Sequence, residues 1–196
     1  LMNLVVCRIH PSIHAAYQEN KEEIETSLAS VYNKLNGIDT ETSRALVKDT
    51  AEQMGETVQG LGGTRTPWLA GYRVKVLDGN CIETTDHRLA ALRGVGAGAL
   101  PGKSLVIYEP ELEVATDVFP CEDGHAQERS LLGGVLPTLE SKDVLIMDRN
   151  FCVRDFLHGI AAAGAYFICR QHRGLPWEED GNERFVGDSE SGAIYE

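Results

Sequence analysis

The chain of 196 residues lacks the features that mark membrane and secreted proteins. No apolar run approaches the roughly 20 residues that span a bilayer. The N-terminal region shows neither a basic leader nor an apolar segment with a cleavage site. We therefore expect a cytoplasmic protein that does not engage membranes. Because the sequence opens with Leu1, we also expect that residues are missing before it.

Closely spaced cysteines and basic clusters are also absent. The five cysteines form no Cys-x-x-Cys pair, which argues against zinc ribbons and thioredoxin-like redox sites. The formal net charge is −12, and no basic cluster marks a surface for nucleic-acid phosphates. The acidic residues gather in 108–128 and 178–196, however, and the remainder is close to neutral. A DNA-facing surface elsewhere is therefore permitted.

Apolar residues at helical spacing dominate the first sixty or so residues. The pattern predicts helices at 12–21 and 23–35, the second closed by Gly37. A longer helix should begin with Thr40 as its N-cap and end at Gly62-Gly63. A linker at 64–67 follows, so the N-terminal third is expected to be helical.

After Trp68 the spacing changes to that of strands. The pattern predicts strands at 72–78, 104–108, 114–119, 143–148 and 166–169, of which the second and third form an antiparallel hairpin and the last two are buried. It also predicts a turn at Gly79-Asn80, a glycine-rich loop at 94–102, and helices at 85–93, 126–132 and 153–163. Beyond Pro176 short strands are expected at 183–186 and 193–195. This order predicts an α/β fold, a mixed sheet with helices packed on it.

Two aspartates end strands that are predicted to run through the core. They are Asp78 in Val-Leu-Asp-Gly-Asn and Asp148 in Ile-Met-Asp-Arg-Asn. Because an unpaired carboxylate is costly to bury, each strand should deliver its charge to a cleft. If the strands are neighbours, the carboxylates converge, and converging oxygen ligands suit Mg²⁺ or Mn²⁺ and phosphoryl transfer. The alternative is that each aspartate only caps the turn or helix after it.

Three competing motifs carry less weight. Gly102-Lys103-Ser104 is similar to the end of a P-loop, but a strand follows where a helix is needed. Gly94-x-Gly96-x-x-Ala99 imitates a dinucleotide fingerprint, yet it follows a helical stretch rather than a strand. A haloacid-dehalogenase phosphatase needs an aspartate where Val76 stands.

Six short motifs occur in order between Tyr72 and His172. They are Val-Leu-Asp-Gly-Asn at 76–80, His-Arg-Leu at 87–89, Leu-Pro-Gly-Lys-Ser-Leu-Val at 100–106, Glu-Asp-Gly-His-Ala-Gln-Glu-Arg at 122–129, Met-Asp-Arg-Asn-Phe-Cys at 147–152 and Arg-Gln-His at 170–172. Together they resemble the DDE transposases of bacterial insertion sequences, specifically the group with a Tyr-Arg-Glu-Lys signature (the IS-four family). The helical start, particularly 27–37, also resembles what precedes the core in such proteins.

The resemblance implies a ribonuclease-H-like core, with Asp78 on its first strand and Asp148 on its fourth. Both would bind two divalent ions, Mg²⁺ or Mn²⁺, that activate water and then a DNA 3′-hydroxyl for in-line attack on phosphodiesters. The partner would be double-stranded DNA, at the transposon ends and at the target, with a homodimer in a synaptic complex as an option.

In this family the third acid is a glutamate on a later helix, after an inserted β-rich domain. No Tyr-x-x-Arg-x-x-x-Glu pattern occurs here. We therefore expect a helical region at 1–66, the first part of the catalytic core at 67–173 and the start of the inserted domain at 174–196, in a chain truncated before the third acid.

The expected function is that of a DNA transposase fragment, which hydrolyses phosphodiesters and transfers strands at transposon ends. One alternative is a catalytically incomplete remnant that binds DNA or regulates transposition. Another is an acidic α/β protein unrelated to transposases, in which the strands of Asp78 and Asp148 are not neighbours.

Three further side chains are candidates for contact with DNA near the metals. They are Arg149 beside Asp148, and Arg170 and His172 at the end of the next strand. The alternative for each is an ordinary surface or ion-paired side chain. A second group, Glu122, Asp123, His125 and Glu128, could suggest a metal cluster, but we interpret its acids as residues that suit a helix N-terminus.

Overall fold

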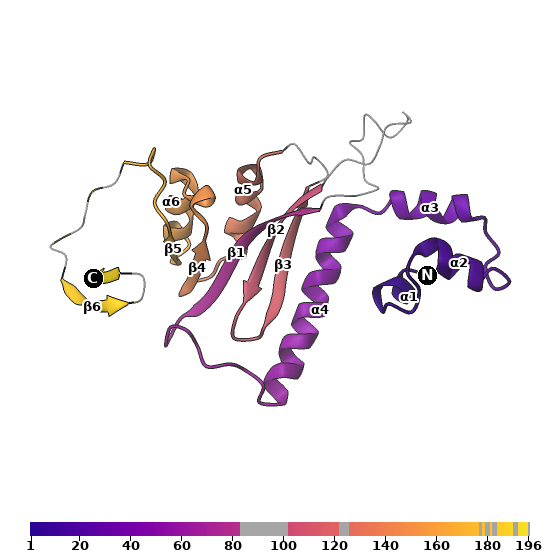
Figure 1. Ribbon diagram of the computed structural model, residues 1–196, viewed down its shortest axis with the longest axis horizontal. Coiled ribbons are helices and arrows are strands. Elements are labelled where there is room, and N and C mark those ends of the chain that lie inside the picture. The colour runs from indigo at the N-terminus through magenta and orange to yellow at the C-terminus, as the bar shows by residue number, and fades with distance from the viewer. Residues whose placement is uncertain are drawn as a thin grey trace.

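The computed structural model of the protein describes residues 1–82, 102–121, 126–176, 178, 181, 184–189 and 192–195. Figure 1 shows a sheet in the middle, N-terminal helices on one side of it and a C-terminal hairpin on the other. The expected helix at 85–93, most of the glycine-rich loop, the motif at 87–89 and the group around His125, except Glu128, lie outside the described residues.

The N-terminal region is helical, as predicted. It contains α1 (Met2–Val6), α2 (Ile13–Glu19), α3 (Leu28–Asn36) and α4 (Thr40–Gly60). The expected start at residue 23 is wrong because Ser27 is the N-cap of α3, where its hydroxyl accepts the N–H of Ser30. Asp39 rather than Thr40 caps α4, since its carboxylate accepts the N–H of Glu41.

Five strands form one mixed sheet. They are β1 (Arg73–Ile82), β2 (Gly102–Glu109), β3 (Val114–Cys121), β4 (Asp143–Met147) and β5 (Tyr166–Cys169), in the order β3-β2-β1-β4-β5. The predicted antiparallel hairpin of β2 and β3 is confirmed. β1 pairs with β2 in antiparallel and with β4 in parallel orientation, and β5 extends the parallel part. The α/β class and the mixed sheet are therefore confirmed.

The strand β1 is longer than its sequence indicates. The turn predicted at Gly79-Asn80 is wrong, because these two residues stay in β1 and pair with Leu105 and Ser104 of β2. β2 reaches back to Gly102, so it supplies partners for β1 beyond the point where β4 ends. Asp78 consequently lies inside β1, immediately after the last pair that β1 makes with β4.

Short helical segments connect the strands on the core side of the sheet. They are η2 (Glu128–Leu131), α5 (Leu132–Val135), η3 (Leu136–Thr138), η4 (Arg149–Phe151) and α6 (Arg154–Ala162). The helix expected at 126–132 starts later and continues past Pro137, which the first turn of η3 tolerates because no N–H is needed there. Gly164, with φ of 71°, ends α6 as predicted.

The hydrophobic core lies between one face of the sheet and these segments. It comprises Leu77, Leu105, Ile107, Phe119, Leu132, Val135, Leu139, Leu145, Met147, Phe151, Phe156, Ile160 and Ala165. β4 is buried, as predicted. The prediction of a buried β5 is wrong: Tyr166, Phe167 and Ile168 are exposed, because β5 is the edge strand of the sheet.

The long helix α4 packs along β3 (Figure 1). Arg44 makes this contact specific, since its guanidinium donates two hydrogen bonds of 2.8 and 2.9 Å to the buried Asp117. The same group lies 4.2 Å above the ring of Phe119.

The chain continues to a separate antiparallel pair of strands, β6 (Phe185–Ser189) and β7 (Gly192–Tyr195), close to the short strands that were predicted there. Within the described ranges, no helix combines the length and the apolar character needed to cross a membrane.

Candidate functional site

The pairing of β1 with β4 puts two aspartates at neighbouring positions of the sheet. The strands are parallel, and their register ends with Leu77 opposite Met147. The next residue on each chain segment is an aspartate, Asp78 after Leu77 and Asp148 after Met147. The expectation that these two strands are neighbours is therefore confirmed, and the interpretation in which they are not is wrong.

Both aspartates face away from the core. Leu77 and Met147 belong to the core cluster. Because successive side chains of a strand alternate between its faces, Asp78 is directed to the opposite face, and Asp148, directly after β4, bonds to Arg170, directly after β5. Both are exposed, Asp148 with 49% of its side-chain surface accessible. The pair can therefore meet a ligand from solution.

Among the described residues, Asp78 has one hydrogen-bond partner. Its Oδ1 accepts the backbone N–H of Gly79 at 2.8 Å. No bond to its Oδ2 is formed within the described part of the chain.

Asp148 is held more firmly. It is the N-cap of η4, and its Oδ1 accepts the backbone N–H of Asn150 at 2.8 Å. Its Oδ2 accepts a hydrogen bond of 3.1 Å from Nη2 of Arg170. The hydrogen bond from the backbone N–H of Asn150 contributes most to lowering the pKa of Asp148 below its usual value, and the bond from Arg170 also lowers it. The carboxylate is consequently ionised at neutral pH.

The three residues predicted to contact DNA occupy different surroundings. Arg149 and Arg170 are exposed at the same end of the sheet as the aspartates, and Arg170 pairs with Asp148. The ring of His172 instead accepts the N–H of Gly174 through Nδ1, at 3.1 Å, and so belongs to a local turn. The backbone N–H of Arg149 also helps to lower the pKa of Asp148, whereas in the described part of the chain neither the side chain of Arg149 nor that of His172 donates to either aspartate.

Glu128, which the sequence analysis interpreted only as an acid at a helix N-terminus, is in the first turn of η2 and also lies at this end of the sheet. Its Oε2 accepts a hydrogen bond of 2.9 Å from Nδ2 of Asn150. Its carboxylate also lies against Gly79, where an added Cβ would come within 2.9 Å of it. One signal could have pointed here: both aspartates open an Asp-x-Asn sequence, at 78–80 and 148–150.

The donor set at this end suits a hard divalent cation. Carboxylate oxygens are the ligands that Mg²⁺ and Mn²⁺ prefer, and two of them come from adjacent parallel strands. In the described ranges, no three side chains of His, Cys, Asp or Glu come together as a metal-binding group.

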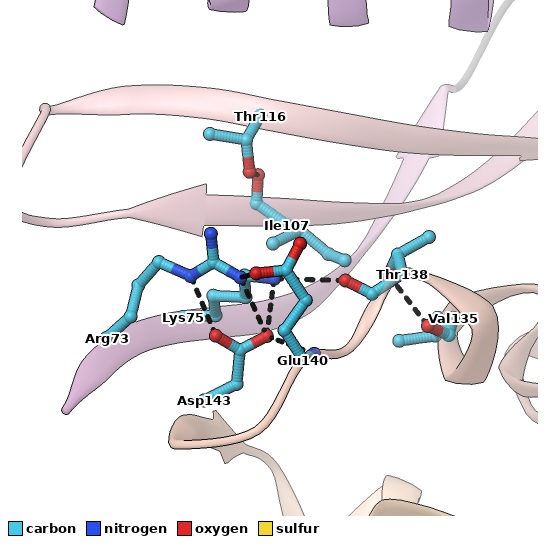
Figure 2. Close-up of polar contacts among 8 residues, drawn as sticks. All are labelled: Arg73, Lys75, Ile107, Thr116, Val135, Thr138, Glu140 and Asp143. Carbon is cyan, nitrogen blue, oxygen red and sulfur yellow. Dashed lines mark hydrogen bonds and ion pairs between the residues drawn. The ribbon is translucent and has the colours of Figure 1, made fainter. Parts of the chain in front are cut away.

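A second polar cluster lies at the opposite end of the same two strands (Figure 2). Asp143 is 1% exposed and accepts bonds of 2.7 Å from Nε of Arg73 and 2.7 Å from Nζ of Lys75. Its Oδ2 also accepts the backbone N–H of Glu140, and Lys75 donates a second bond to the carbonyl of Thr138. Every charge in this buried cluster has a partner.

The electrostatics of this second cluster are those of a structural ion pair. Burial raises the pKa of Asp143, but the bonds from Arg73 and Lys75 outweigh it, so the pKa is lowered overall. A polar cleft beside the cluster, between α4 and the sheet, is lined by Lys48, Glu52, Arg73 and Glu109 among others. Burial raises the pKa of Glu109. No sequence signal singled out this cluster beyond the alternation of Arg73 and Lys75 on one strand.

Comparison with known proteins adds no further assignment: no protein-family model matches the chain, and no curated protein matches its sequence.

Proposed function

We propose that the protein is a DNA transposase of the DDE type, or the part of one that carries its first two catalytic acids. The observation that supports this most is the parallel pairing of β1 with β4, which brings Asp78 and Asp148 to adjacent strands. The sequence motifs that resemble the IS-four transposases contain these same two residues. Sequence resemblance and sheet register thus point to the same pair.

We further propose that the sheet is the first part of a ribonuclease-H-like core. Three features support this finer assignment. The strands β1, β2 and β3 form an antiparallel series, β4 joins β1 on its other side in parallel, and β5 extends the sheet from β4. The first acid lies on the first strand and the second lies just after the fourth, as the resemblance implies.

The aspartates would hold two divalent ions, Mg²⁺ or Mn²⁺, which when bound supply the activation of water and of a DNA 3′-hydroxyl for attack on phosphodiesters. The chain's own contribution is to present two carboxylates on a rigid strand pair. Asp148 is kept ionised by the N–H of Asn150 and by Arg170. Asp78 is exposed beside it, so a phosphate backbone can approach from solution.

Double-stranded DNA is the proposed partner, and a homodimer on two DNA ends is compatible with this proposal. Arg149 and Arg170 are exposed at the carboxylate end of the sheet and would contact phosphates, with His172 close by in sequence. Replacing Arg149 or Arg170 by alanine should weaken binding to a DNA duplex and reduce the slope of log K against log salt by about one each. Fluorescence anisotropy at several salt concentrations measures this. Equal slopes in both variants and in the unaltered chain would exclude the assigned contacts.

The test of the metal site is Mn²⁺ binding to the full chain, followed by electron paramagnetic resonance. Asp78→Asn and Asp148→Asn should each abolish the site, because asparagine keeps the shape but loses the charge that a hard cation requires. Asp155→Asn is the matched control, since Asp155 is another exposed aspartate, in the first turn of α6. Mn²⁺ binding that both site variants retain would refute the proposed function.

The second candidate is an incomplete transposase that binds DNA without cleaving it. The observation in its favour is that the described residues bring together two carboxylates and no third metal-binding side chain. Nicking of supercoiled DNA in Mn²⁺ separates the candidates. Nicking that Asp148→Asn abolishes supports the enzyme, whereas DNA and Mn²⁺ binding without nicking supports the remnant.

A further inference from the structure

We propose that η2 positions the two chain segments that carry Asp78 and Asp148, through a set of contacts that we call the η2 clamp. The clamp consists of Glu128 and Arg129 and their contacts to Asn150 and Gly79. The inference rests on the proposed function, because its purpose is to keep the two carboxylates in register for a shared cation. It makes Glu128 a positioning residue, distinct from the two aspartates.

The clamp holds the segment after β4 at two points. Nδ2 of Asn150 donates to Oε2 of Glu128 at 2.9 Å, and Nε of Arg129 donates to the backbone carbonyl of Asn150 at 2.7 Å. Both bonds involve a charged side chain, and such bonds are roughly twice as strong as neutral ones. The backbone N–H of Asn150 in turn donates to Oδ1 of Asp148. Asn150 is therefore fixed from one side by η2 and fixes Asp148 on the other.

The same carboxylate reaches β1. A Cβ built at Gly79 would lie 2.7 Å from Cδ, 2.8 Å from Oε1 and 2.9 Å from Oε2 of Glu128. Real Cβ atoms do not come so close, so only glycine lets Glu128 occupy this place. Gly79 is the residue after Asp78 and donates its N–H to Asp78 Oδ1. One glutamate side chain therefore lies beside Gly79, the residue after Asp78, and bonds to Asn150, two residues after Asp148.

Glu128 acts from the core side of the sheet. Gly79 follows Leu77 by two residues and so shares its face, which is the face of the core, whereas Asp78 points to the other face. The Glu128 carboxylate thus lies across the strand from the carboxylate of Asp78. Side chains that orient metal ligands without binding the metal commonly change metal affinity 10- to 100-fold when they are removed.

The first test compares three variants of the full chain by Mn²⁺ affinity. Glu128→Ala and Asn150→Ala each remove the side-chain hydrogen bond between Glu128 and Asn150 and leave the Arg129 bond to the Asn150 carbonyl in place, and each should weaken Mn²⁺ binding by about 10-fold or more. Glu128→Gln keeps an oxygen that accepts from Asn150, so its loss should stay below about threefold. The chain with both Glu128→Ala and Asn150→Ala should lose no more Mn²⁺ affinity than the more affected single variant, because the two substitutions remove the same hydrogen bond.

The second test uses the glycine. Gly79→Ala should displace the Glu128 carboxylate and weaken Mn²⁺ binding to a similar extent. In a chain that already carries Glu128→Ala, the same glycine change should have no further effect, because the space is then free. Amide hydrogen exchange of Asn150 gives a readout without metal: exchange should accelerate in Glu128→Ala and stay slow in Glu128→Gln.

The outcomes separate the clamp from the proposed function. If the unaltered chain does not bind Mn²⁺ through Asp78 and Asp148, the proposed function fails, and the clamp fails with it. If the chain binds Mn²⁺ and Glu128→Ala leaves affinity and exchange unchanged, only the clamp is overturned. If Glu128→Gln loses as much affinity as Glu128→Ala, the charge of Glu128 matters rather than its bond to Asn150, and the clamp is again overturned.

Discussion

The two ends of the β1–β4 strand pair carry carboxylates in opposite surroundings. At the start of the strands, Asp143 is buried and accepts bonds from Arg73, from Lys75 and from a backbone N–H. At the other end, Asp78 and Asp148 are exposed and have fewer partners. The same pair of parallel strands therefore presents one carboxylate to the protein and two to the solvent.

Burial and hydrogen bonding distinguish the Asp143 carboxylate, which lies inside the fold, from the carboxylates of Asp78 and Asp148, which are open to solvent. A buried charge is tolerated only when it is paired and hydrogen-bonded, and Asp143 meets this condition through Arg73, Lys75 and the N–H of Glu140. Exposed carboxylates on adjacent strands add little to stability and keep lone pairs for a cation. Variants at the two ends should accordingly separate stability from binding.

The largest effect is expected from Asp143→Ala. Removing this carboxylate leaves Lys75 buried without its counter-charge, and breaking a buried pair in this way costs about 3–5 kcal/mol of stability. Urea unfolding followed by circular dichroism measures the loss. Glu140→Ala is the control, because Glu140 bonds to the same Arg73 but its side chain is 74% exposed, and its loss should be below about 1 kcal/mol. Equal losses in the two variants would contradict the comparison.

Lowering the pH should reduce the contribution of the Asp143 cluster to the free energy of unfolding. The folded protein lowers the pKa of Asp143 below the value of about 3.9 that an unfolded chain shows. Its contribution to stability is therefore complete above that unfolded value and is lost as the pH falls through the lower, folded value. The free energy of unfolding, measured from pH 7 down to pH 2, should fall less steeply in Asp143→Asn than in the unaltered chain. Identical slopes would show that Asp143 does not contribute.

At the other end, Asp78→Asn and Asp148→Asn should change stability by no more than about 0.5 kcal/mol. Both side chains are exposed, and asparagine at 148 retains an oxygen that can accept the N–H of Asn150 as an N-cap. The same urea experiment tests this alongside Mn²⁺ binding. A large loss of stability in either variant would mean that these carboxylates are structural, like Asp143.

The smallest effect concerns the charge state of Asp148. Arg170→Ala removes one of the hydrogen bonds that lower the pKa of Asp148, so the pKa should rise toward its usual value. The bond from Asn150 remains, and the rise should therefore be partial. Carbon-detected NMR titration of the Asp148 carboxyl group measures it. Arg173→Ala serves as the control, and an equal shift in that variant would exclude the specific role of Arg170.

Local patterns along the chain predicted most of the elements. Alternation and buried runs indicated β2, β3 and β4, and helical spacing indicated α4 and α6. The wrong predictions occur where the pairing of strands in the sheet outweighs the conformational preference of the local sequence. Gly79 and Asn80 read as a turn but stay in β1 because β2 extends alongside them. The sequence of β5 predicts a buried strand, but β5 is the last strand in the sheet that the described residues form, and its side chains are exposed.

In the candidate site, too, some residues could be selected from the local sequence and others could not. The aspartates could be selected from the sequence because a carboxylate that ends an apolar run must reach solvent or a partner. Glu128 could not be selected in this way, since its contacts are with residues 49 positions earlier and 22 positions later in the chain. Nothing in the local sequence around Glu128 specifies those neighbours.

Local sequence patterns were enough to predict most strands and helices and to select Asp78 and Asp148 as charges that a buried strand would not retain. The parallel pairing of β1 with β4, the ion pairs of Asp143 with Arg73 and Lys75, and the position of Glu128 against Gly79 became known from the three-dimensional fold. The two kinds of information differ in the distance along the chain over which the residues interact. Secondary structure follows from periodicity over a few residues, whereas the pairing of charges depends on which distant strands share hydrogen bonds.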